Sequence, residues 1–262
     1  MKKETRDLLL EIVRCPNIDA CYKESGCVCN DIVKVQKCER ENFSVPEPWN
    51  GDLENAKILF VSSNPSFNES ENYPEMKWDD EKIIEFFDGR FNGKYTVVRK
   101  DNKVCVRNVD GANGKAEPYW GYIRNRTAEL LYNNCEDMVK HGEDYCLTEV
   151  VHCKSKNEKG LNSSVISECY NKYFNRLVRL SNCKVIIIVG NKAFRTLTAS
   201  GIKISEELLR KGDKKIYSEE VELENGVKKL FTYLDAPAAG EPLKSFMKFP
   251  PEEFEKIKSI LL

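Results

Sequence analysis

Cysteine is the residue whose number and spacing in this sequence point most directly to chemistry. The chain has 262 residues and eleven cysteines. Cys153 and Cys169 lie sixteen positions apart, the first at the end of a predicted strand and the second on the inward face of a predicted helix, so their sulfurs can meet. Four such thiolates would suit an iron-sulfur cluster or a zinc ion. Alternatively, Cys169 is a core cysteine and Cys153 has no special role.

The amino-terminal segment can supply the other thiolates. The pattern of residues 4–14 predicts a helix that ends at a cysteine, and a cysteine-rich stretch follows. The cysteines there are Cys15, Cys21, Cys27, Cys29 and Cys38. In a reducing cytosol, so many thiols indicate metal ligation rather than disulfides. We expect a single domain, with a cysteine-rich segment over 1–50 and an α/β core over 51–262.

A polar turn within residues 56–66, AKILFVSSNPS, is the second candidate for chemistry. Its first half is apolar, as expected of a strand covered on both faces, and its second half consists of turn-forming residues. Open α/β sheets bind ligands at the carboxyl ends of their strands. Asn64, with Ser63 and Ser66 beside it, is therefore a candidate functional residue, although an ordinary turn is the alternative.

The composition argues against two classes of protein. Hydrophobic residues make up 41% of the chain and charged residues 32%, but the formal net charge is only -1, so binding to nucleic acid would need a local basic patch. The sequence has no positively charged start followed by a long apolar run, so we expect no signal peptide, and it has no apolar stretch of membrane-spanning length. We expect a soluble, cytoplasmic monomer that does not bind membranes.

Periodicity predicts strands that alternate with helices. Predicted core strands cover residues 58–61, 147–152 and 184–190, and predicted helices cover 78–91, 118–134, 163–180, 191–200 and 251–262. Runs at 95–98 and 104–109, about Asp101 and Asn102, predict an inserted β-hairpin, and runs at 216–223 and 227–234, joined through 224–226, predict another. This order predicts a three-layer α/β/α sandwich with a mostly parallel central sheet. Three turns, at 62–66, 152–154 and 235–238, should lie at strand ends.

The order of these segments resembles the uracil-DNA glycosylase superfamily. The similar stretches are KILFVSSNPS, TEVVHC, the helix that contains Cys169 with the strand after it, and LFTYLDAPAAG. They lie within residues 5–240 and look most like the branches that carry a 4Fe-4S cluster on two amino-terminal cysteines and two later ones. The resemblance implies a structural cluster that ties the amino-terminal segment and a DNA-contacting loop to the core.

The resemblance also implies which cysteines hold the cluster. Three positions match its ligands: Cys15, Cys153 and Cys169. The family commonly has its second amino-terminal cysteine three residues after the first, whereas the next one here is Cys21, which we take as the fourth ligand. Cys27 and Cys29 are rivals for that place, and zinc is the alternative metal.

The turn SSNPS matches the family's first motif in position. Its sequence resembles the Asn-Pro version of this motif in the mismatch-specific and single-strand-selective branches, in which the asparagine positions the attacking water. Asn64 would thus orient a water toward the anomeric carbon of a flipped nucleotide. An amide is a poor base, so it can only orient the water.

Two positions depart from the family pattern. Glu149 stands where the relatives usually have an asparagine that reads the edge of uracil; an ionised glutamate offers only acceptors, which suits a base edge with an amino group better. The late turn 236–238 reads Ala-Pro-Ala where the family has His-Pro-Ser, so it brings no imidazole to stabilise the departing base. Ala236 and Pro237 remain candidate DNA-contacting positions.

Aromatic and basic side chains complete the predicted site. Tyr73 and Trp120 are candidates for stacking on a flipped base, and Ser63 is a further candidate for contacting that base. For both rings, the alternative is that they anchor the core. Lys154 and Lys156 lie in the loop after Cys153 and are candidates for phosphate contacts, although a solvated loop is the alternative.

Three functions compete on this evidence. The first is a DNA glycosylase that carries a 4Fe-4S cluster and excises a modified or deaminated base. The second is a non-catalytic nucleic-acid-binding protein on the same scaffold, favoured by Glu149 and the turn 236–238. The third is a zinc-stapled α/β protein that acts on a free nucleotide. We expect the first.

Overall fold

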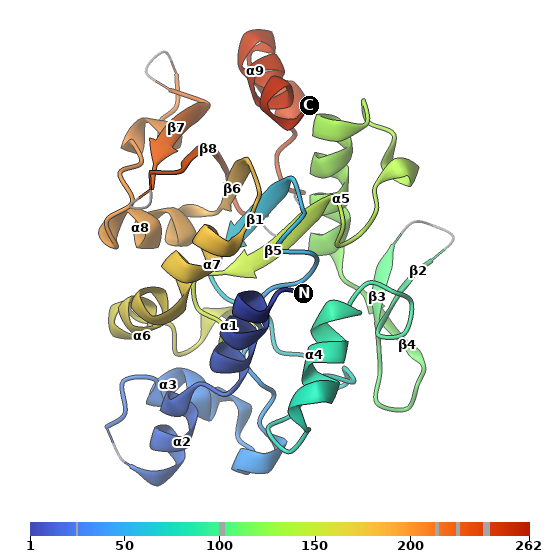
Figure 1. Cartoon of the computed structure of the whole chain (residues 1–262), viewed down its shortest axis with the longest axis vertical. Helices are drawn as coiled ribbons and strands as arrows, with labels where there is room; N and C mark the ends of the chain where they lie inside the picture. Colours follow the sequence, from blue (N-terminus) through green and yellow to red (C-terminus); the bar gives the residue numbers. More distant parts are fainter. Residues whose placement is uncertain (25, 100–102, 213–214, 224–225, 238–241) are drawn as a thin grey trace.

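The central feature of the fold is a five-stranded sheet. The computed structural model describes residues 1–24, 26–99, 103–212, 215–223, 226–237 and 242–262 (Figure 1). The sheet has the order β5-β1-β6-β8-β7. Its strands are β1 (Ile58–Ser62), β5 (Tyr145–Glu149), β6 (Val185–Val189), β7 (Ser218–Glu222) and β8 (Lys228–Leu234). β5, β1, β6 and β8 are parallel and β7 is antiparallel to β8, so the predicted mostly parallel sheet is confirmed.

Buried side chains cover both faces of this sheet. On β1, Leu59 and Val61 belong to one apolar cluster, whereas Ile58 and Phe60 belong to another, because successive residues of a strand point to opposite faces. Helices that contribute to the first cluster are α1 (Lys3–Val13), α4 (Asp80–Asp88), α6 (Ser163–Cys169), α7 (Asn175–Leu180) and α8 (Asn191–Ala199). Those that contribute to the second are α5 (Pro118–Leu131) and α9 (Pro251–Leu261). The three-layer α/β/α arrangement is therefore confirmed.

The predicted helix over 163–180 is interrupted. A π-helical turn, Tyr170–Phe174, separates α6 from α7 and begins directly after Cys169. Such π-turns are frequent at functional sites. The apolar periodicity of the sequence continues through the turn, because Tyr170, Tyr173 and Phe174 are buried, and so the pattern did not reveal it.

The amino-terminal segment folds into short helices. α2 (Pro16–Lys23) and α3 (Asn30–Val33) follow α1, and 3-10 turns at Lys34–Gln36 and Arg40–Asn42 lead to the core. Ile18 and Ile32 are buried in the same apolar cluster as Leu177 of α7. The segment therefore packs against the core beside α6 and α7 (Figure 1).

The predicted hairpin insertion is a three-stranded antiparallel sheet. It consists of β2 (Thr96–Val98), β3 (Val104–Arg107) and β4 (Asn113–Ala116). The sequence of β4, Asn-Gly-Lys-Ala, has low strand propensity, which is why it was not predicted. Asp101 and Asn102 lie outside the described residues. β7 and β8 form the second predicted hairpin, whose turn at 224–225 is also outside them.

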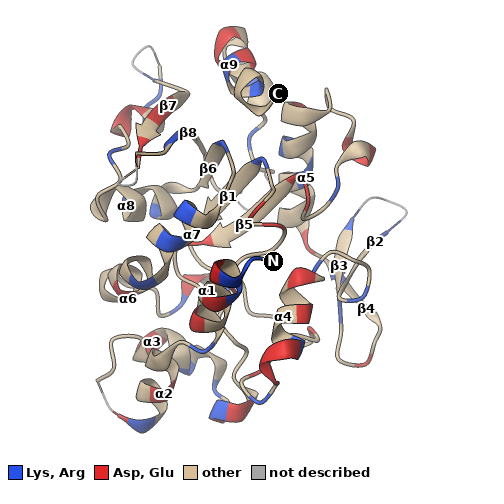
Figure 2. Cartoon of the chain, in the orientation of Figure 1, with Lys and Arg blue, Asp and Glu red and all other residues tan. Residues whose placement is uncertain are grey.

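Charged residues of both signs are interspersed over the elements. Lys and Arg lie beside Asp and Glu on most helices (Figure 2), and many form exposed pairs such as Arg14 with Asp80 and Lys82 with Asp79. Within the described ranges, no helix is both long enough and apolar enough to cross a membrane.

Candidate functional site

The candidate site lies where the chain leaves β1 and β5. The register pairs Ser62 with Glu149, and the backbone N–H groups of Val150 and Val151 donate to the carbonyl oxygens of Ser62 and Ser63. The two chains thus continue side by side beyond the strands. Two of the three predicted turns, 62–66 and 152–154, therefore lie together at the carboxyl edge of the sheet.

The third turn reaches this edge from β8. Gly190, directly after β6, has φ +89°, and a Cβ at that position would lie 3.0 Å from the Cβ of Ala236. The glycine therefore allows a left-handed backbone and a close approach of the two strand ends. Ala238 lies outside the described residues.

A cavity of about 290 Å³ opens among these strand ends. Its volume is at the small end of the range for ligand pockets, about 300–1,000 Å³. Seven of the predicted site residues line it: Ser63, Asn64, Trp120, Glu149, Lys154, Ala236 and Pro237. Other lining residues include Glu47, Glu71, Arg90, Glu117 and Tyr119. Residues from at least six separate segments thus form one site.

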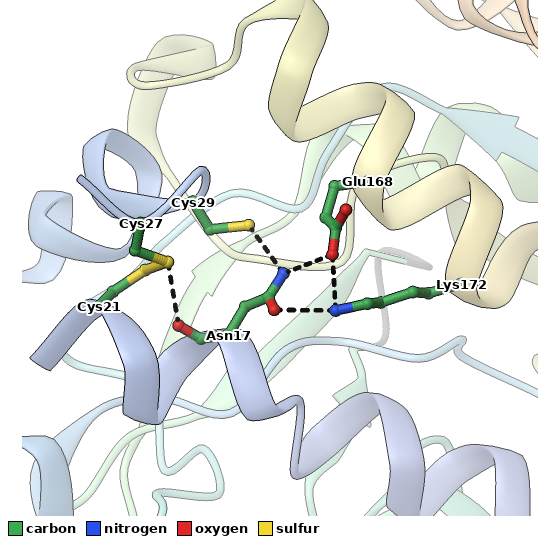
Figure 3. Close-up of a disulfide and its surroundings, with 6 residues drawn as sticks. All are labelled: Asn17, Cys21, Cys27, Cys29, Glu168 and Lys172. Carbon is green, nitrogen blue, oxygen red and sulfur yellow. Dashed lines mark hydrogen bonds and ion pairs between the residues drawn. A yellow bond between two sulfur atoms is a disulfide. The ribbon is translucent and has the colours of Figure 1, made fainter. Parts of the chain in front are cut away.

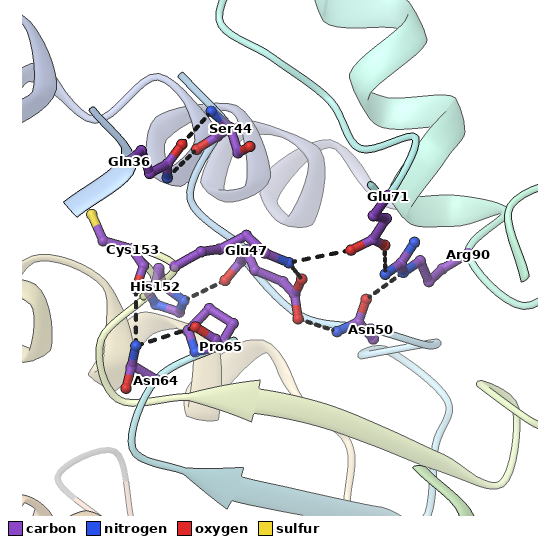
Figure 4. A network of polar contacts seen from close by, with 11 residues as sticks. Gln36, Ser44, Glu47, Asn50, Asn64, Pro65, Glu71, Arg90, His152 and Cys153 are labelled. Carbon is purple, nitrogen blue, oxygen red and sulfur yellow. Dashed lines mark hydrogen bonds and ion pairs between the residues drawn. The ribbon is translucent and has the colours of Figure 1, made fainter. Parts of the chain in front are cut away.

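The amide of Asn64 is held in a defined orientation. Its Nδ2 donates to the hydroxyl of Ser155 at 2.9 Å and points at the carbonyl oxygens of Pro65 at 3.2 Å and Cys153 at 3.4 Å. The amide oxygen consequently points away from Cys153 and Pro65 (Figure 4). That oxygen is an acceptor of the kind that can orient a water molecule.

No family model matches this chain, and no curated protein matches it. The resemblance to the uracil-DNA glycosylase superfamily stays a prediction, and the chemistry of the site follows from its residues.

Lys154 lies in a different environment from the one we predicted. It is 3% exposed, and its Nζ donates to Glu47 Oε2 at 2.8 Å. The prediction of a surface phosphate contact by Lys154 is therefore wrong, because its ammonium is inside the cavity wall. Lys156 is exposed and pairs with Glu69 at 3.2 Å, and it does not belong to the described lining of the cavity.

Tyr73 supports the cavity wall from behind. Its ring packs edge-on against Phe86 and Phe87, with centroid distances of 5.2 and 6.0 Å, and Lys154 Nζ lies 3.8 Å from the ring centroid. Among the described residues it is Trp120 and Tyr119, at the start of α5, that present rings to the cavity. We expected Tyr73 to stack on a base, but its ring instead packs against Lys154 and does not belong to the described lining of the cavity.

Five buried polar residues form a closed ring in the cavity wall, which we call the charge ring. Its members are Glu47, Asn50, Glu71, Arg90 and Lys154, each 8% exposed or less. The first four are labelled in Figure 4. Asn50 Nδ2 donates to Glu47 at 2.6 Å and Arg90 Nε donates to Asn50 Oδ1 at 3.2 Å. Arg90 also pairs with Glu71, whose Oε2 lies 3.9 Å from Lys154 Nζ. Two cations balance two anions.

No pattern in the sequence predicted the charge ring. Its members come from the last residues of the amino-terminal segment, from the loop before α4, from the turn just after α4 and from the loop after β5. Charged groups are rarely buried unless they are paired, and such buried pairs often mark functional sites. Burial opposes ionisation of Glu47, but Lys154 and Arg90 lower the pKa of its carboxyl below the usual value.

Glu149 is a carboxyl group of a different kind. It is 6% exposed, lines the cavity, and its Oε2 has no hydrogen-bond partner within the described part of the chain. Burial, and next the negative charge of Glu47, raise the pKa of Glu149 well above its usual value. This direction favours the protonated carboxyl, which has an O–H donor as well as an acceptor. Our expectation of an acceptor-only glutamate is therefore replaced by that of a carboxyl group that can also donate.

We expect Glu149→Gln to stabilise the protein as the pH rises. The unfolded glutamate ionises near pH 4.5, whereas the folded one keeps its proton, so the wild type loses stability between that pH and its raised folded pKa. Urea unfolding at pH 8 should show a gain of about 1 kcal/mol or more for the variant, with little difference at pH 4. The exposed Glu255→Gln is the control, and an equal effect at both pH values would contradict the assignment.

Neither of the chain's two histidines, both of them described, lines this cavity. His141 Nδ1 lies 2.5 Å from the Tyr145 hydroxyl, and His152 Nδ1 lies 2.8 Å from the carbonyl oxygen of Glu47. Burial lowers the pKa of both imidazoles to about 4. The cavity therefore has no imidazole to assist chemistry.

A second, apolar cavity is lined by four cysteines. They are Cys15, Cys29, Cys153 and Cys169, together with Ile18, Val33, Val151, Val165 and Tyr173. Burial raises the pKa of the Cys153 thiol well above its usual value, and the other three cysteines raise it further, which reflects their proximity. The structure thus joins Cys153 and Cys169, as predicted, to two amino-terminal thiols.

The fourth of these thiols is Cys29 rather than Cys21. Cys21 forms a disulfide with Cys27, and Asn17 lies between that disulfide and Cys29 (Figure 3). The carbonyl oxygen of Asn17 lies 3.5 Å from Cys27 Sγ, and Asn17 Nδ2 donates to Cys29 Sγ at 3.4 Å. Our choice of Cys21 is therefore wrong: α2 carries it away from the cavity, and the turn before α3 brings Cys29 in.

The four thiols of this cavity are possible ligands for a zinc ion or an iron-sulfur cluster. Within the described residues, no three or more His, Cys, Asp or Glu side chains are grouped closely enough for a single metal ion. Zinc needs its thiolates within about 2.3 Å of one point. The four thiols are the donor type that an iron-sulfur cluster takes, so an iron-sulfur cluster stays the prediction for this cavity.

Proposed function

We propose that this protein is a DNA glycosylase that hydrolyses the N-glycosidic bond of a modified or deaminated nucleotide and carries a structural 4Fe-4S cluster. The observation that supports this most directly is the lining of one nucleobase-sized cavity by Asn64, Trp120 and Glu149, which come from separate segments. The resemblance of the same segments to the uracil-DNA glycosylase superfamily, from which the roles of Asn64 and Glu149 were predicted, also supports it. We propose a cytoplasmic location.

Each lining residue has a role in this proposal. The ring of Trp120 stacks on the flipped base, and the neutral carboxyl of Glu149 donates to one group of its edge and accepts from another. The amide oxygen of Asn64 orients a water toward the anomeric carbon. Such an edge carries an acceptor next to a donor, as uracil does, so Glu149 is compatible with a uracil-like base.

The cluster would be held by the four thiols of the second cavity. Cys15 and Cys29 belong to the amino-terminal segment, whereas Cys153 and Cys169 flank the loop that follows β5. A cluster here would tie that segment to the loop that positions Asn64, because Cys153 and Ser155 both contact the Asn64 amide. Its role in the proposal is structural.

The test is a base-release assay with the purified full chain, together with iron, sulfide and zinc analysis. The substrates are single- and double-stranded oligonucleotides that contain uracil, hypoxanthine, xanthine or an alkylated base. We expect iron and sulfide in equal amounts and release of at least one base. Absence of release from every substrate by folded, iron-loaded protein would contradict the proposal.

A non-catalytic binding protein is the second candidate. It is favoured by Ala236 at the cavity, where the family motif has histidine, and by the absence of any imidazole from the described lining. This candidate predicts salt-dependent binding of the same oligonucleotides without base release. Binding that is unchanged in Asn64→Ala would support it.

A further inference from the structure

Hydrolysis of an N-glycosidic bond leaves negative charge on the departing base, and the described lining has no histidine to stabilise it. We propose that Lys154 performs this function: its ammonium is an anion site at the cavity wall that stabilises the base as it leaves. This inference rests on the proposed function for its reaction, whereas the anion site itself can be tested without it.

Lys154 is attached to the same short segment that holds Asn64. The residues on either side of it, Cys153 and Ser155, both accept from the Asn64 amide nitrogen, at 3.4 and 2.9 Å. Lys154 and Asn64 line one cavity. A group that positions water and a group that stabilises the leaving base must both lie around the same anomeric carbon, and this segment joins them.

The charge ring holds the ammonium in place and leaves it able to bind a further acceptor. Lysine has three N–H donors. In the described residues, Glu47 at 2.8 Å is its hydrogen-bonded carboxylate, while Glu71 at 3.9 Å is beyond hydrogen-bond distance. The Tyr73 ring lies 3.8 Å from Nζ and supports it from behind. An oxygen or nitrogen of a departing base can therefore accept a hydrogen bond from an N–H group of Lys154 that does not donate to Glu71.

Arg90 is the other cation of the cavity, and its contacts give it a different role. Its guanidinium donates to Asn50 and Glu71 and lies against the rings of Phe86 and Trp120, at 4.7 and 5.1 Å from their centroids. Its Nη1 has no hydrogen-bond partner within the described residues, but its charge is delocalised over the guanidinium and paired with Glu71. The compact ammonium of Lys154 is better suited to a localised anion.

The proposed step balances as follows. The bond between C1′ and the base nitrogen breaks, and both its electrons leave with the base. The oxygen of the water oriented by Asn64 bonds to C1′, and the proton lost by that water ends on the base or in solvent. Lys154 donates a hydrogen bond to the anionic base and keeps its own protons, so it ends the step unchanged.

The first test measures how release depends on the acidity of the leaving base. Single-turnover rates are compared for single-stranded oligonucleotides that contain deoxyuridine or 5-fluorodeoxyuridine, because the fluorinated base is the better anion. The variant is Lys154→Met/Glu47→Gln, which removes one charge of each sign from the ring. The control is Lys228→Met/Glu220→Gln, an exposed pair at 3.1 Å on β8 and β7.

We expect the ring variant to release uracil about 100-fold more slowly or worse, and 5-fluorouracil with at least about tenfold less loss. The control pair should leave both rates within about twofold. An equal loss for the two bases would overturn the proposal, because a purely structural role of Lys154 slows both alike.

The second test does not require turnover. Free 5-nitrouracil is an anion at neutral pH and thymine is neutral, and tryptophan fluorescence reports binding near Trp120. The wild type should bind the anion at least about tenfold more tightly, and the ring variant should lose this preference. Binding of neither compound, or an unchanged preference in the variant, would overturn the proposal. If the wild type releases no base but shows the preference, the glycosylase proposal fails and the anion site stands.

Discussion

Replacing Asn64 with alanine should slow base release by about 100-fold or more, a loss typical of removing one well-placed polar group from a reacting centre. The amide oxygen of Asn64 points away from the groups that hold its nitrogen, so it can fix a water molecule in the cavity. Alanine removes that acceptor and leaves the cavity lining otherwise intact. The measurement is single-turnover release of whichever base the wild type excises.

The loss of activity has to be separated from a loss of stability. Asn64→Ala also removes the hydrogen bond to Ser155, which should cost about 1 kcal/mol. Asp79→Ala is a control of similar cost, because Asp79 caps α4 through Lys82 and lies outside the described lining of the cavity. If both variants lose activity equally, or if Asn64→Ala keeps the wild-type rate, Asn64 does not orient the attacking water.

Local patterns in the sequence were sufficient to predict the frame of the site. An apolar run that breaks into turn residues identified β1 and the turn with Asn64, and the same logic located β5 and β6. Parallel strands bring their carboxyl ends to one edge, so seven predicted residues line one cavity. These features depend on residues that are close together in the chain.

Features that depend on distant partners were not predictable. The sequence around Lys154 predicts an exposed lysine in a loop. Its burial depends on its contact with Glu47, which lies 107 positions earlier in the chain. The raised pKa of Glu149 depends on burial and on that same Glu47 charge. Neither spacing nor periodicity contains this information, because both effects arise only when the link from the amino-terminal segment packs beside β5.

The choice between cysteines illustrates the same limit. Cys21 is the next cysteine after Cys15, and we predicted it as the ligand for that reason, although it departs from the family spacing. A helical turn decides which sulfur faces the cavity. Cys21 lies within α2, and its sulfur pairs with Cys27, whereas Cys29 immediately precedes α3 and faces Cys153. Sequence order alone could not separate them.

Cys29→Ser should therefore lower the metal content, whereas Cys21→Ser should leave it unchanged. With dithiothreitol present, Cys21→Ser should keep the iron, the sulfide and the brown absorption of the wild type, whereas Cys29→Ser should lose most of each. Loss of the cluster should also release the amino-terminal segment from the loop beside Asn64. The melting temperature should fall by more than about 5 °C, since each kcal/mol shifts it by about 2–4 °C in a chain of this size.

The comparison is sharp because the two variants change the same atom in the same segment. Cys135→Ser, at an exposed cysteine, controls for the substitution itself. If Cys21→Ser loses the iron while Cys29→Ser retains it, Cys21 is the ligand and the Cys21–Cys27 disulfide does not exist in the loaded protein. If both retain it, the cluster does not lie in this cavity. Because Cys153 also contacts Asn64 through its carbonyl oxygen, loss of iron in Cys29→Ser should lower base release as well, through a displaced Asn64 amide.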